Sequence, residues 1–166
     1  EERQEFLNRL VQHWIKDYRP SQVMKDLLAI VGDKDYFILT SNADTHLELS
    51  GFAPDKMFEV EGTFEDLLHN RPMQDKSQEA NAFLHRYHGK RLVIFELGIG
   101  SRNRLIKLPL MQLVAREPQA TYITLNLAQE LYIPDEIAGK SIGLAGDIAD
   151  TLRKLKEKQR TDDNIS

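Results

Sequence analysis

Polar residues suited to contacting a ribose or a carboxamide follow several short apolar runs of this sequence. The run at residues 36–40 leads into Ser41, Asn42, Ala43 and Asp44, which offer a hydroxyl, an amide and a carboxylate. Such groups hydrogen-bond to ribose hydroxyls and to a carboxamide. The alternative is that Asn42 or Asp44 caps the following helix through its free backbone N–H groups. For Asp44, the residues alone favour the cap.

A glycine-rich turn follows the most strand-like run, residues 91–97. The turn contains Gly98, Gly100, Ser101 and Arg102. Its glycines leave space where a backbone could approach a phosphate or a ribose. The spacing is not that of the common dinucleotide-binding fingerprint. Ligand binding and an ordinary tight turn are therefore both open for this segment.

The position after two further runs is also polar. Asn126 follows residues 121–125, and Asp147 follows residues 141–144 after a glycine. Each of these residues alone is typical of a turn or a helix cap. Four polar strand ends together favour one shared crevice, because independent caps need not converge.

The elements that must position these residues alternate between helices and strands. Apolar residues at helical spacing predict helices over residues 4–18 and 22–31, with Ser21 as the N-cap of the second helix and Gly32 as its end. A short strand is predicted at residues 57–60, and a final helix at residues 148–158 with a fraying tail. This alternation predicts an α/β fold with a Rossmann-like, doubly wound parallel sheet, in which ligands bind beyond the carboxyl ends of the strands.

Length and composition fit one globular domain over residues 1–166. The sequence is 41% hydrophobic and 29% charged, with a net charge of −4. The negative balance argues against a nucleic-acid partner, and no run is long enough to cross a membrane, so a cytoplasmic location is expected. Cysteine is absent, which excludes disulfides, catalytic thiols and cysteine-bound zinc. The five histidines show no metal-binding spacing.

In their order, these segments resemble the sirtuin family, in particular its macrodomain-linked microbial class. The resemblance extends from about residue 26 to residue 155 and rests on DLLAIVGDKDYFILTSNAD, GFAPDKMFEVEG, HGKRLVIFELGIGSRNRLIKLPL, EPQATYITLN and IGLAGDI. It implies the Rossmann-like large domain of a sirtuin with NAD as co-substrate. The implied reaction breaks the glycosidic bond to nicotinamide and transfers ADP-ribose to an acceptor protein.

The resemblance also implies roles for individual residues. Asn42 matches the catalytic asparagine that orders the ribose hydroxyls and nearby water, and Asp44 matches the aspartate that contacts the nicotinamide carboxamide. Ser41 is a further cofactor-binding position. The others that the resemblance implies are Gly98, Gly100, Ser101 and Arg102 beside the phosphates and ribose, Asn126 near the adenosine ribose, and Asp147 with Ile148 beside the adenine.

Three departures from the family pattern stand beside these matches. Sirtuins begin with a strand and a Gly-Ala-Gly-x-Ser loop, and no such motif precedes Glu1. Three explanations are open: the chain is a fragment, the sequence is incomplete, or NAD binding is weakened. Glu61 stands where the family has a histidine base and this class a glutamine. A partly buried glutamate would have a raised pKa and could act as a base, whereas an exposed one fits a silent relative. Residues 63–87 read as a reduced helical segment in place of the cysteine-rich zinc ribbon, so no zinc is expected.

Two classes of function follow from the resemblance. The first is an NAD-dependent protein ADP-ribosyltransferase, with deacylation or NAD hydrolysis as variant reactions. The second is a module that binds NAD or ADP-ribose without catalysis, which the three departures favour.

Overall fold

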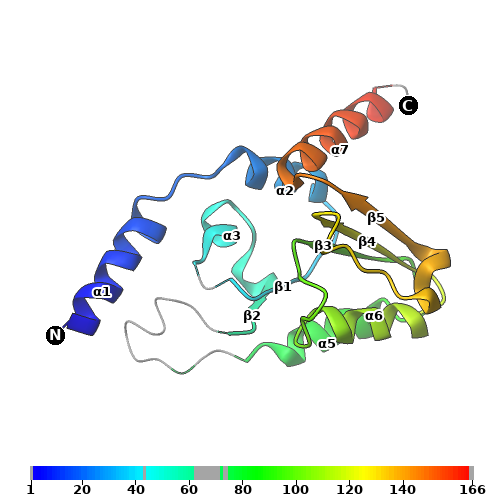
Figure 1. The fold of residues 1–166 in the computed structure, drawn as a ribbon, viewed down its shortest axis with the longest axis horizontal. Coiled ribbons are helices and arrows are strands. Elements are labelled where there is room, and N and C mark those ends of the chain that lie inside the picture. The colour runs from blue at the N-terminus through cyan, green and yellow to red at the C-terminus, as the bar shows by residue number, and fades with distance from the viewer. Residues whose placement is uncertain (1, 43, 62–71, 73–74, 165–166) are drawn as a thin grey trace. The chain divides into compact units, whose positions relative to one another are not determined.

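The computed structural model describes residues 2–42, 44–61, 72 and 75–164. The chain forms two compact units, residues 1–82 and 83–166, and the division falls within helix α5 (Ser77–Arg86). Each unit contains helices and a parallel sheet, so the fold class is α/β (Figure 1). Within the reduced helical segment predicted over residues 63–87, residues 63–71, 73 and 74 lie outside the described residues, and α5 forms a helix in the remainder.

The first unit holds a two-stranded parallel sheet. Its elements are α1 (Glu2–Val11), a turn of π-helix (Gln12–Lys16), α2 (Gln22–Val31), β1 (Ile38–Thr40), α3 (His46–Leu49), a 3₁₀ turn (Pro54–Lys56) and β2 (Met57–Glu59). Strands β1 and β2 pair in register from Ile38 with Met57 to Thr40 with Glu59. Phe52 and Met57 are buried and form part of the core of this unit.

Local signals set the bounds of the elements in the first unit. Ser21 caps α2, as predicted, by accepting the backbone N–H of Met24 at 3.3 Å. Gly32 ends the helix at a φ of 57°, a conformation that glycine adopts without strain. The strand predicted over residues 36–40 begins only at Ile38. The hydroxyl of Tyr36, before the strand, accepts the Ala53 N–H at 2.9 Å.

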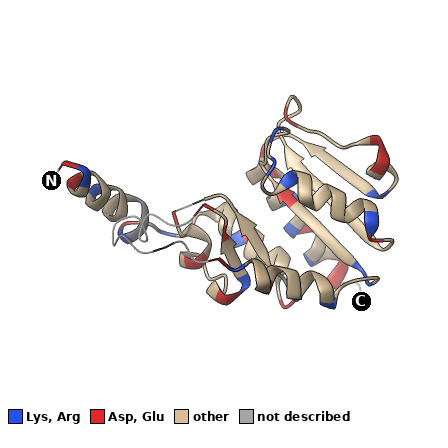
Figure 2. Cartoon of the chain, turned by 90° about the horizontal axis from the view of Figure 1, so that it is seen from below, with Lys and Arg blue, Asp and Glu red and all other residues tan. Residues whose placement is uncertain are grey.

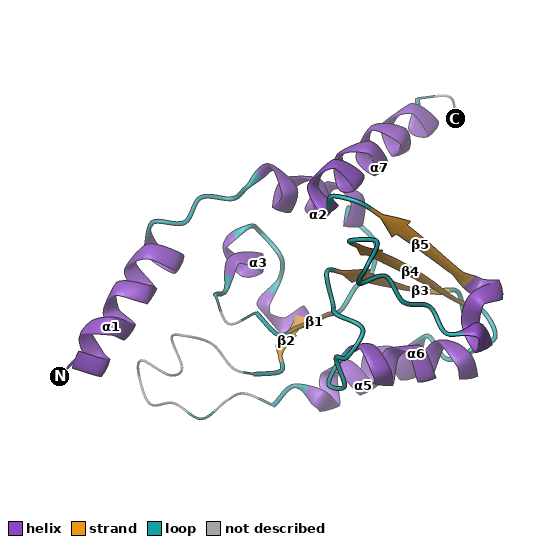
Figure 3. Ribbon diagram, viewed as in Figure 1, coloured by secondary structure: helices purple, strands orange, loops and turns teal. Residues whose placement is uncertain are grey.

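The second unit holds a three-stranded parallel sheet in the order β3-β4-β5. Its elements are β3 (Leu92–Leu97), α6 (Lys107–Arg116), β4 (Ala120–Asn126), a 3₁₀ segment (Asp135–Lys140), β5 (Ser141–Ala145) and α7 (Ile148–Asp163). Helices α6 and α7 lie on opposite sides of these strands (Figures 1 and 3). The central strand β4 is the most buried, with Tyr122, Thr124 and Leu125 almost inaccessible to solvent.

Helix α7 is longer than the sequence pattern indicates. The predicted end at residue 158 and the fraying tail are wrong, because the helix continues to Asp163. Ion pairs between residues three or four apart run along it, including Asp150 with Lys154 at 2.7 Å and Arg153 with Glu157 at 3.0 Å. Such pairs support a polar helix where apolar periodicity gives no signal.

Acidic and basic residues are interspersed along the helices of both units (Figure 2). This mixture accords with the small net charge of −4. Within the described residues, no helix combines the length and the apolarity needed to cross a bilayer.

At the amino-terminal edge of the second sheet, Glu117 joins the end of α6 to the segment before β3. Its carboxylate accepts the Gly89 N–H at 2.9 Å and lies 2.7 Å from His88 Nδ1. Lys140 Nζ donates to the backbone oxygen of Glu117 at 2.8 Å, which ties in the segment before β5. The Gly89 N–H, with a further contribution from His88, lowers the pKa of Glu117 below its usual value of 4.5.

This lowered pKa makes the stability of the second unit acid-sensitive. The unfolded chain binds the proton more readily than the folded one, so the stabilisation from Glu117 is complete above about pH 4.5 and falls as the pH drops through the lower folded value. We expect Glu117→Gln to lose less stability between about pH 5 and pH 3 than the wild type, as measured by urea unfolding at each pH. Parallel pH profiles for the two proteins would contradict the prediction. Glu136→Gln, which changes an exposed carboxylate of the same unit, is the control.

Candidate functional site

Asn42 and Glu61 lie beyond the same edge of the first sheet. Strands β1 and β2 are parallel and their last paired residues are Thr40 and Glu59, so both side chains stand two residues past that pair. The Val60 N–H extends the ladder by donating to the Thr40 backbone oxygen at 2.9 Å. The Asn42 N–H donates to Thr40 Oγ1 at 3.0 Å, which fixes the turn after β1. Ser41 and Asn42 are both exposed there.

Glu61 does not have the burial that would tune a general base. It is exposed, so the partial burial that a basic role would require is absent. Within the described part of the chain, a buried carboxylate oxygen without a hydrogen-bond partner belongs instead to Glu59, at the end of β2. Unpaired buried oxygens are uncommon in native proteins.

Asp44 is engaged by the helix that it precedes. Its Oδ1 accepts the His46 N–H at 3.1 Å, and Oδ2 lies 3.3 Å from His46 Nδ1. The His46 ring stacks on Tyr18, with 3.8 Å between ring centroids. The Tyr18 hydroxyl and Ser50 Oγ are 2.9 Å apart, and Ser50 donates to the His46 backbone oxygen at 2.6 Å. The N-cap position of α3 is Thr45, so Asp44 binds the first N–H of the helix from one residue further out, and this contact orients one face of the carboxylate.

Sequence reasoning did not connect His46 or Tyr18 with Asp44. The spacing Asn-x-Asp-x-His is visible in residues 42–46, and a carboxylate two residues before a histidine is a local signal. Tyr18 gave no such signal, because it is distant in sequence and its contact depends on how the helices pack.

In the second unit, the loops after β3 and β5 leave the same edge of the sheet. The Gly98 N–H donates to the Leu125 oxygen at 2.9 Å, and the Gly146 N–H donates to the Asn126 oxygen at 3.0 Å. Both glycines have positive φ angles, 65° and 141°. The ladder therefore continues one residue past each strand before the chain turns away.

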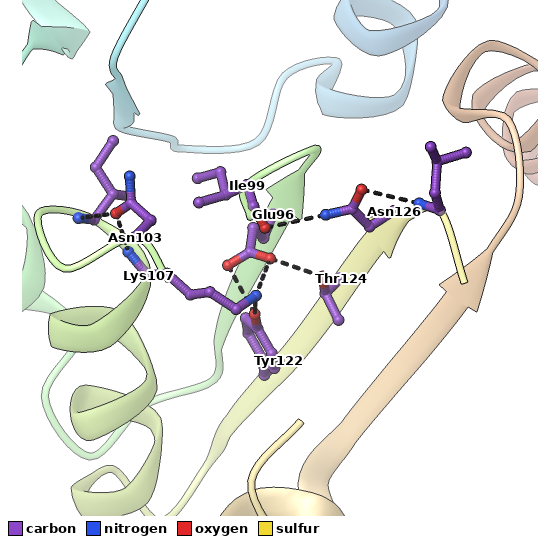
Figure 4. Close-up of polar contacts among 9 residues, drawn as sticks. Glu96, Ile99, Asn103, Lys107, Tyr122, Thr124 and Asn126 are labelled. Atoms are coloured by element: carbon purple, nitrogen blue, oxygen red, sulfur yellow. Dashed lines mark hydrogen bonds and ion pairs between the residues drawn. The ribbon is translucent and has the colours of Figure 1, made fainter. Parts of the chain in front are cut away.

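Asn126 joins these two loops. Its Nδ2 donates to the Ile99 backbone oxygen at 3.0 Å, while its Oδ1 accepts the Leu127 N–H at 2.9 Å (Figure 4). Asn126 is buried, with 7% of its surface exposed, and it is the last residue of β4 rather than the first after it. The side chain thus holds the glycine-rich loop.

Asp147 caps α7 by accepting the Asp150 N–H at 2.9 Å. Its neighbour Ile148 lies against the glycine turn, since a Cβ added to Gly98 would be 3.2 Å from Ile148 Cδ1. The loop itself presents Ser101 and Arg102 to solvent. The structure therefore brings together the predicted residues of the second unit, which are Gly98, Gly100, Ser101, Arg102, Asn126, Asp147 and Ile148. The remaining predicted residues, Ser41, Asn42, Asp44 and Glu61, belong to the first unit.

Four buried polar residues beneath the glycine-rich loop were not predicted. Glu96, Lys107, Tyr122 and Thr124 form a hydrogen-bonded quartet on the face of the sheet that α6 covers (Figure 4). Burial and the nearby Glu96 carboxylate raise the pKa of the Tyr122 phenol well above its usual range. A glutamate in the apolar run LVIFEL was the available signal, since its position shares a face with buried Leu92 and Ile94.

Comparison with known proteins assigns no family. No family model matches this chain, and no curated protein matches it. Among the side chains that the structure describes, no group of three His, Asp or Glu residues is arranged to hold a metal ion.

Proposed function

We propose that this chain is a sirtuin-type protein with a Rossmann-like fold that binds NAD, releases nicotinamide and transfers ADP-ribose to an acceptor protein. The observation that carries the proposal is the location of the candidate residues. In each parallel sheet they lie at or beyond the carboxyl ends of the strands, at the edge where α/β folds bind nucleotides.

The chemistry requires positioning more than a strong nucleophile. As the bond from ribose C1′ to the nicotinamide nitrogen breaks, its electron pair leaves with nicotinamide and positive charge develops on the ribose. The exposed amide of Asn42 supplies a dipole for the ribose hydroxyls and that charge. The acceptor's nucleophile then bonds to C1′ and loses its proton. The Glu61 carboxylate, at the same sheet edge, is the candidate base.

In the second unit, the proposal gives the glycine-rich loop a phosphate and ribose role. Ser101 and Arg102 are exposed and carry a hydroxyl and a guanidinium, both of which hydrogen-bond to phosphate oxygens. Asn126 acts through the loop, because its amide holds the Ile99 carbonyl. The loop is thereby set before any ligand arrives, which reduces the ordering cost of binding.

The test is turnover of NAD by the complete gene product. NAD labelled in the adenylate part is incubated with the protein and a mixture of candidate acceptors, and nicotinamide and protein-bound label are measured. Nicotinamide release with labelled protein supports transfer, and release with free ADP-ribose supports hydrolysis. Absence of both release and NAD binding would refute the proposal.

A binding module without catalysis is the second candidate. The exposure of Glu61 favours it, since an exposed carboxylate is a poor general base at neutral pH. Calorimetric titration with NAD and ADP-ribose separates the two functions. Binding without nicotinamide release supports the module.

Two glycines in the loop allow ligand contact to be separated from folding. Gly100 has no positive φ, and an added Cβ would meet Glu130 Oε2 at an ordinary 3.6 Å. We expect Gly100→Ala to leave the unfolding free energy unchanged while weakening ADP-ribose binding about tenfold or more, because a methyl group enters the space of the ligand. Calorimetry and urea unfolding measure the two effects.

Gly98→Ala is the matched comparison. It places a Cβ at a φ of 65° and 3.2 Å from Ile148 Cδ1, so we expect it to destabilise the protein by about 1–2 kcal/mol. Unchanged ADP-ribose affinity in Gly100→Ala would argue against close approach of the ligand to this turn.

A further inference from the structure

The buried quartet beneath the glycine-rich loop is hydrogen-bonded around one carboxylate. Glu96 Oε1 accepts from Lys107 Nζ at 2.6 Å and from Thr124 Oγ1 at 2.8 Å. Glu96 Oε2 accepts from the Tyr122 hydroxyl at 2.7 Å, and that hydroxyl in turn accepts from Lys107 Nζ at 2.9 Å. All four residues are buried, and Lys107 is completely inaccessible to solvent.

The two charged members stand at the two ends of the loop. Glu96 is the penultimate residue of β3 and Lys107 is the first residue of α6, so their ion pair closes the connection at residues 97–106. Further contacts hold the connection from within (Figure 4). Asn103 Oδ1 accepts the Ile106 N–H at 2.7 Å and the Lys107 N–H at 3.1 Å. The exposed Ser101 therefore lies in a loop whose two ends are held by hydrogen bonds.

Stability alone gives no reason to bury this pair. Removing two charges from water costs about as much as their attraction returns, and well-packed apolar residues in place of a buried pair often leave a protein equally stable. What an ion pair adds is direction, because its hydrogen bonds are satisfied in one arrangement only. Here that arrangement determines where β3 ends relative to where α6 begins.

We propose that Glu96, Lys107, Tyr122 and Thr124 form a positioning network that holds the loop at residues 98–106 ready for the ribose and phosphates of an ADP-ribose moiety. The identification of the ligand as ADP-ribose rests on the proposed function. The inference that the network positions the loop rests only on the contacts of the second unit. Disrupting the network is expected to lower the fraction of molecules with a binding-competent loop, and the apparent affinity falls by that fraction.

The test removes both charges together in Glu96→Gln with Lys107→Met, which retains the side-chain sizes. Hydrogen exchange of backbone amides, read by mass spectrometry without ligand, is expected to rise about tenfold at residues 98–106 and to stay unchanged in β4, with a similar loss of ADP-ribose affinity in calorimetry. The control is Glu5→Gln with Arg9→Met, which removes an exposed ion pair of 2.7 Å in the other unit. The control is expected to change neither measurement.

Each outcome decides the inference. Wild-type exchange in the loop of the double variant would overturn it, as would faster exchange with undiminished ADP-ribose affinity. If the wild type itself does not bind ADP-ribose, the proposed function fails, and the exchange measurement still decides whether the network holds the loop. If the double variant unfolds, Tyr122→Phe removes only the bridging hydroxyl and is judged by the same two measurements.

Discussion

Asn42→Ala is expected to reduce nicotinamide release by roughly two to three orders of magnitude, the cost of removing one dipole at a developing charge. Folding should be unaffected. The contact that Asn42 makes with Thr40 Oγ1 uses the backbone N–H, which alanine retains, and the side chain is exposed. Release of nicotinamide from NAD, measured at saturating NAD beside a thermal unfolding curve, checks both parts of the prediction.

A second asparagine provides the control for this experiment. Asn81 is exposed on α5, and Asn81→Ala should leave both nicotinamide release and unfolding unchanged. Equal release by wild type and Asn42→Ala would remove Asn42 from the proposed mechanism. A lower melting temperature in Asn42→Ala would show that the residue has a structural role that its contacts do not indicate.

Lys107→Met is expected to lower the free energy of unfolding by about 3–5 kcal/mol, because it leaves the Glu96 carboxylate buried without its counter-charge. Glu96 would retain its hydrogen bonds from Tyr122 and Thr124, which offset only part of that cost. Urea unfolding of the wild type and the variant measures the difference.

Adding Glu96→Gln to Lys107→Met should restore most of the lost stability. The amide is neutral, so the penalty for an unpaired buried charge disappears while the Tyr122 hydroxyl still has an acceptor. The double-mutant cycle isolates the coupling between the two residues. A double variant as unstable as the sum of the single variants would mean that the pair is not coupled, contrary to its 2.6 Å contact.

The same cycle bears on the loop. If the double variant is stable but its loop exchanges faster, the pair contributes conformational order and not fold stability. If stability and loop order recover together, the quartet is merely a core contact. The stability measurement therefore has to precede any interpretation of ADP-ribose affinity.

Much of the local architecture was predictable from the residues. The Ser21 cap, the Gly32 end of α2 and the strands β3 and β4 lie within one or two residues of their predicted bounds. These features depend on caps, glycine conformations and apolar runs, which act over a few residues. The polar residues after the strands were found for the same reason.

The features that differ from the predictions depend on contacts that the nearest residues in the chain do not determine. Helix α7 continues past its apolar pattern to Asp163, where the Asn164 N–H donates to the Arg160 backbone oxygen. Asn126 ends β4 instead of following it, because its backbone oxygen stays in the ladder with Gly146. Glu61 is exposed, and its place in the sequence did not predict this because burial depends on tertiary packing.

The sequence by itself determined which residues stand at the strand ends and that the elements alternate in an α/β order. Only the tertiary structure decided what those residues touch: Asn126 on the Ile99 carbonyl, His46 between Asp44 and Tyr18, and the quartet around Glu96. The reason is range. Backbone preferences and caps are set by neighbours in the chain, whereas a contact between Glu96 and Tyr122, 26 residues apart, exists only once strand register and helix packing have brought them together.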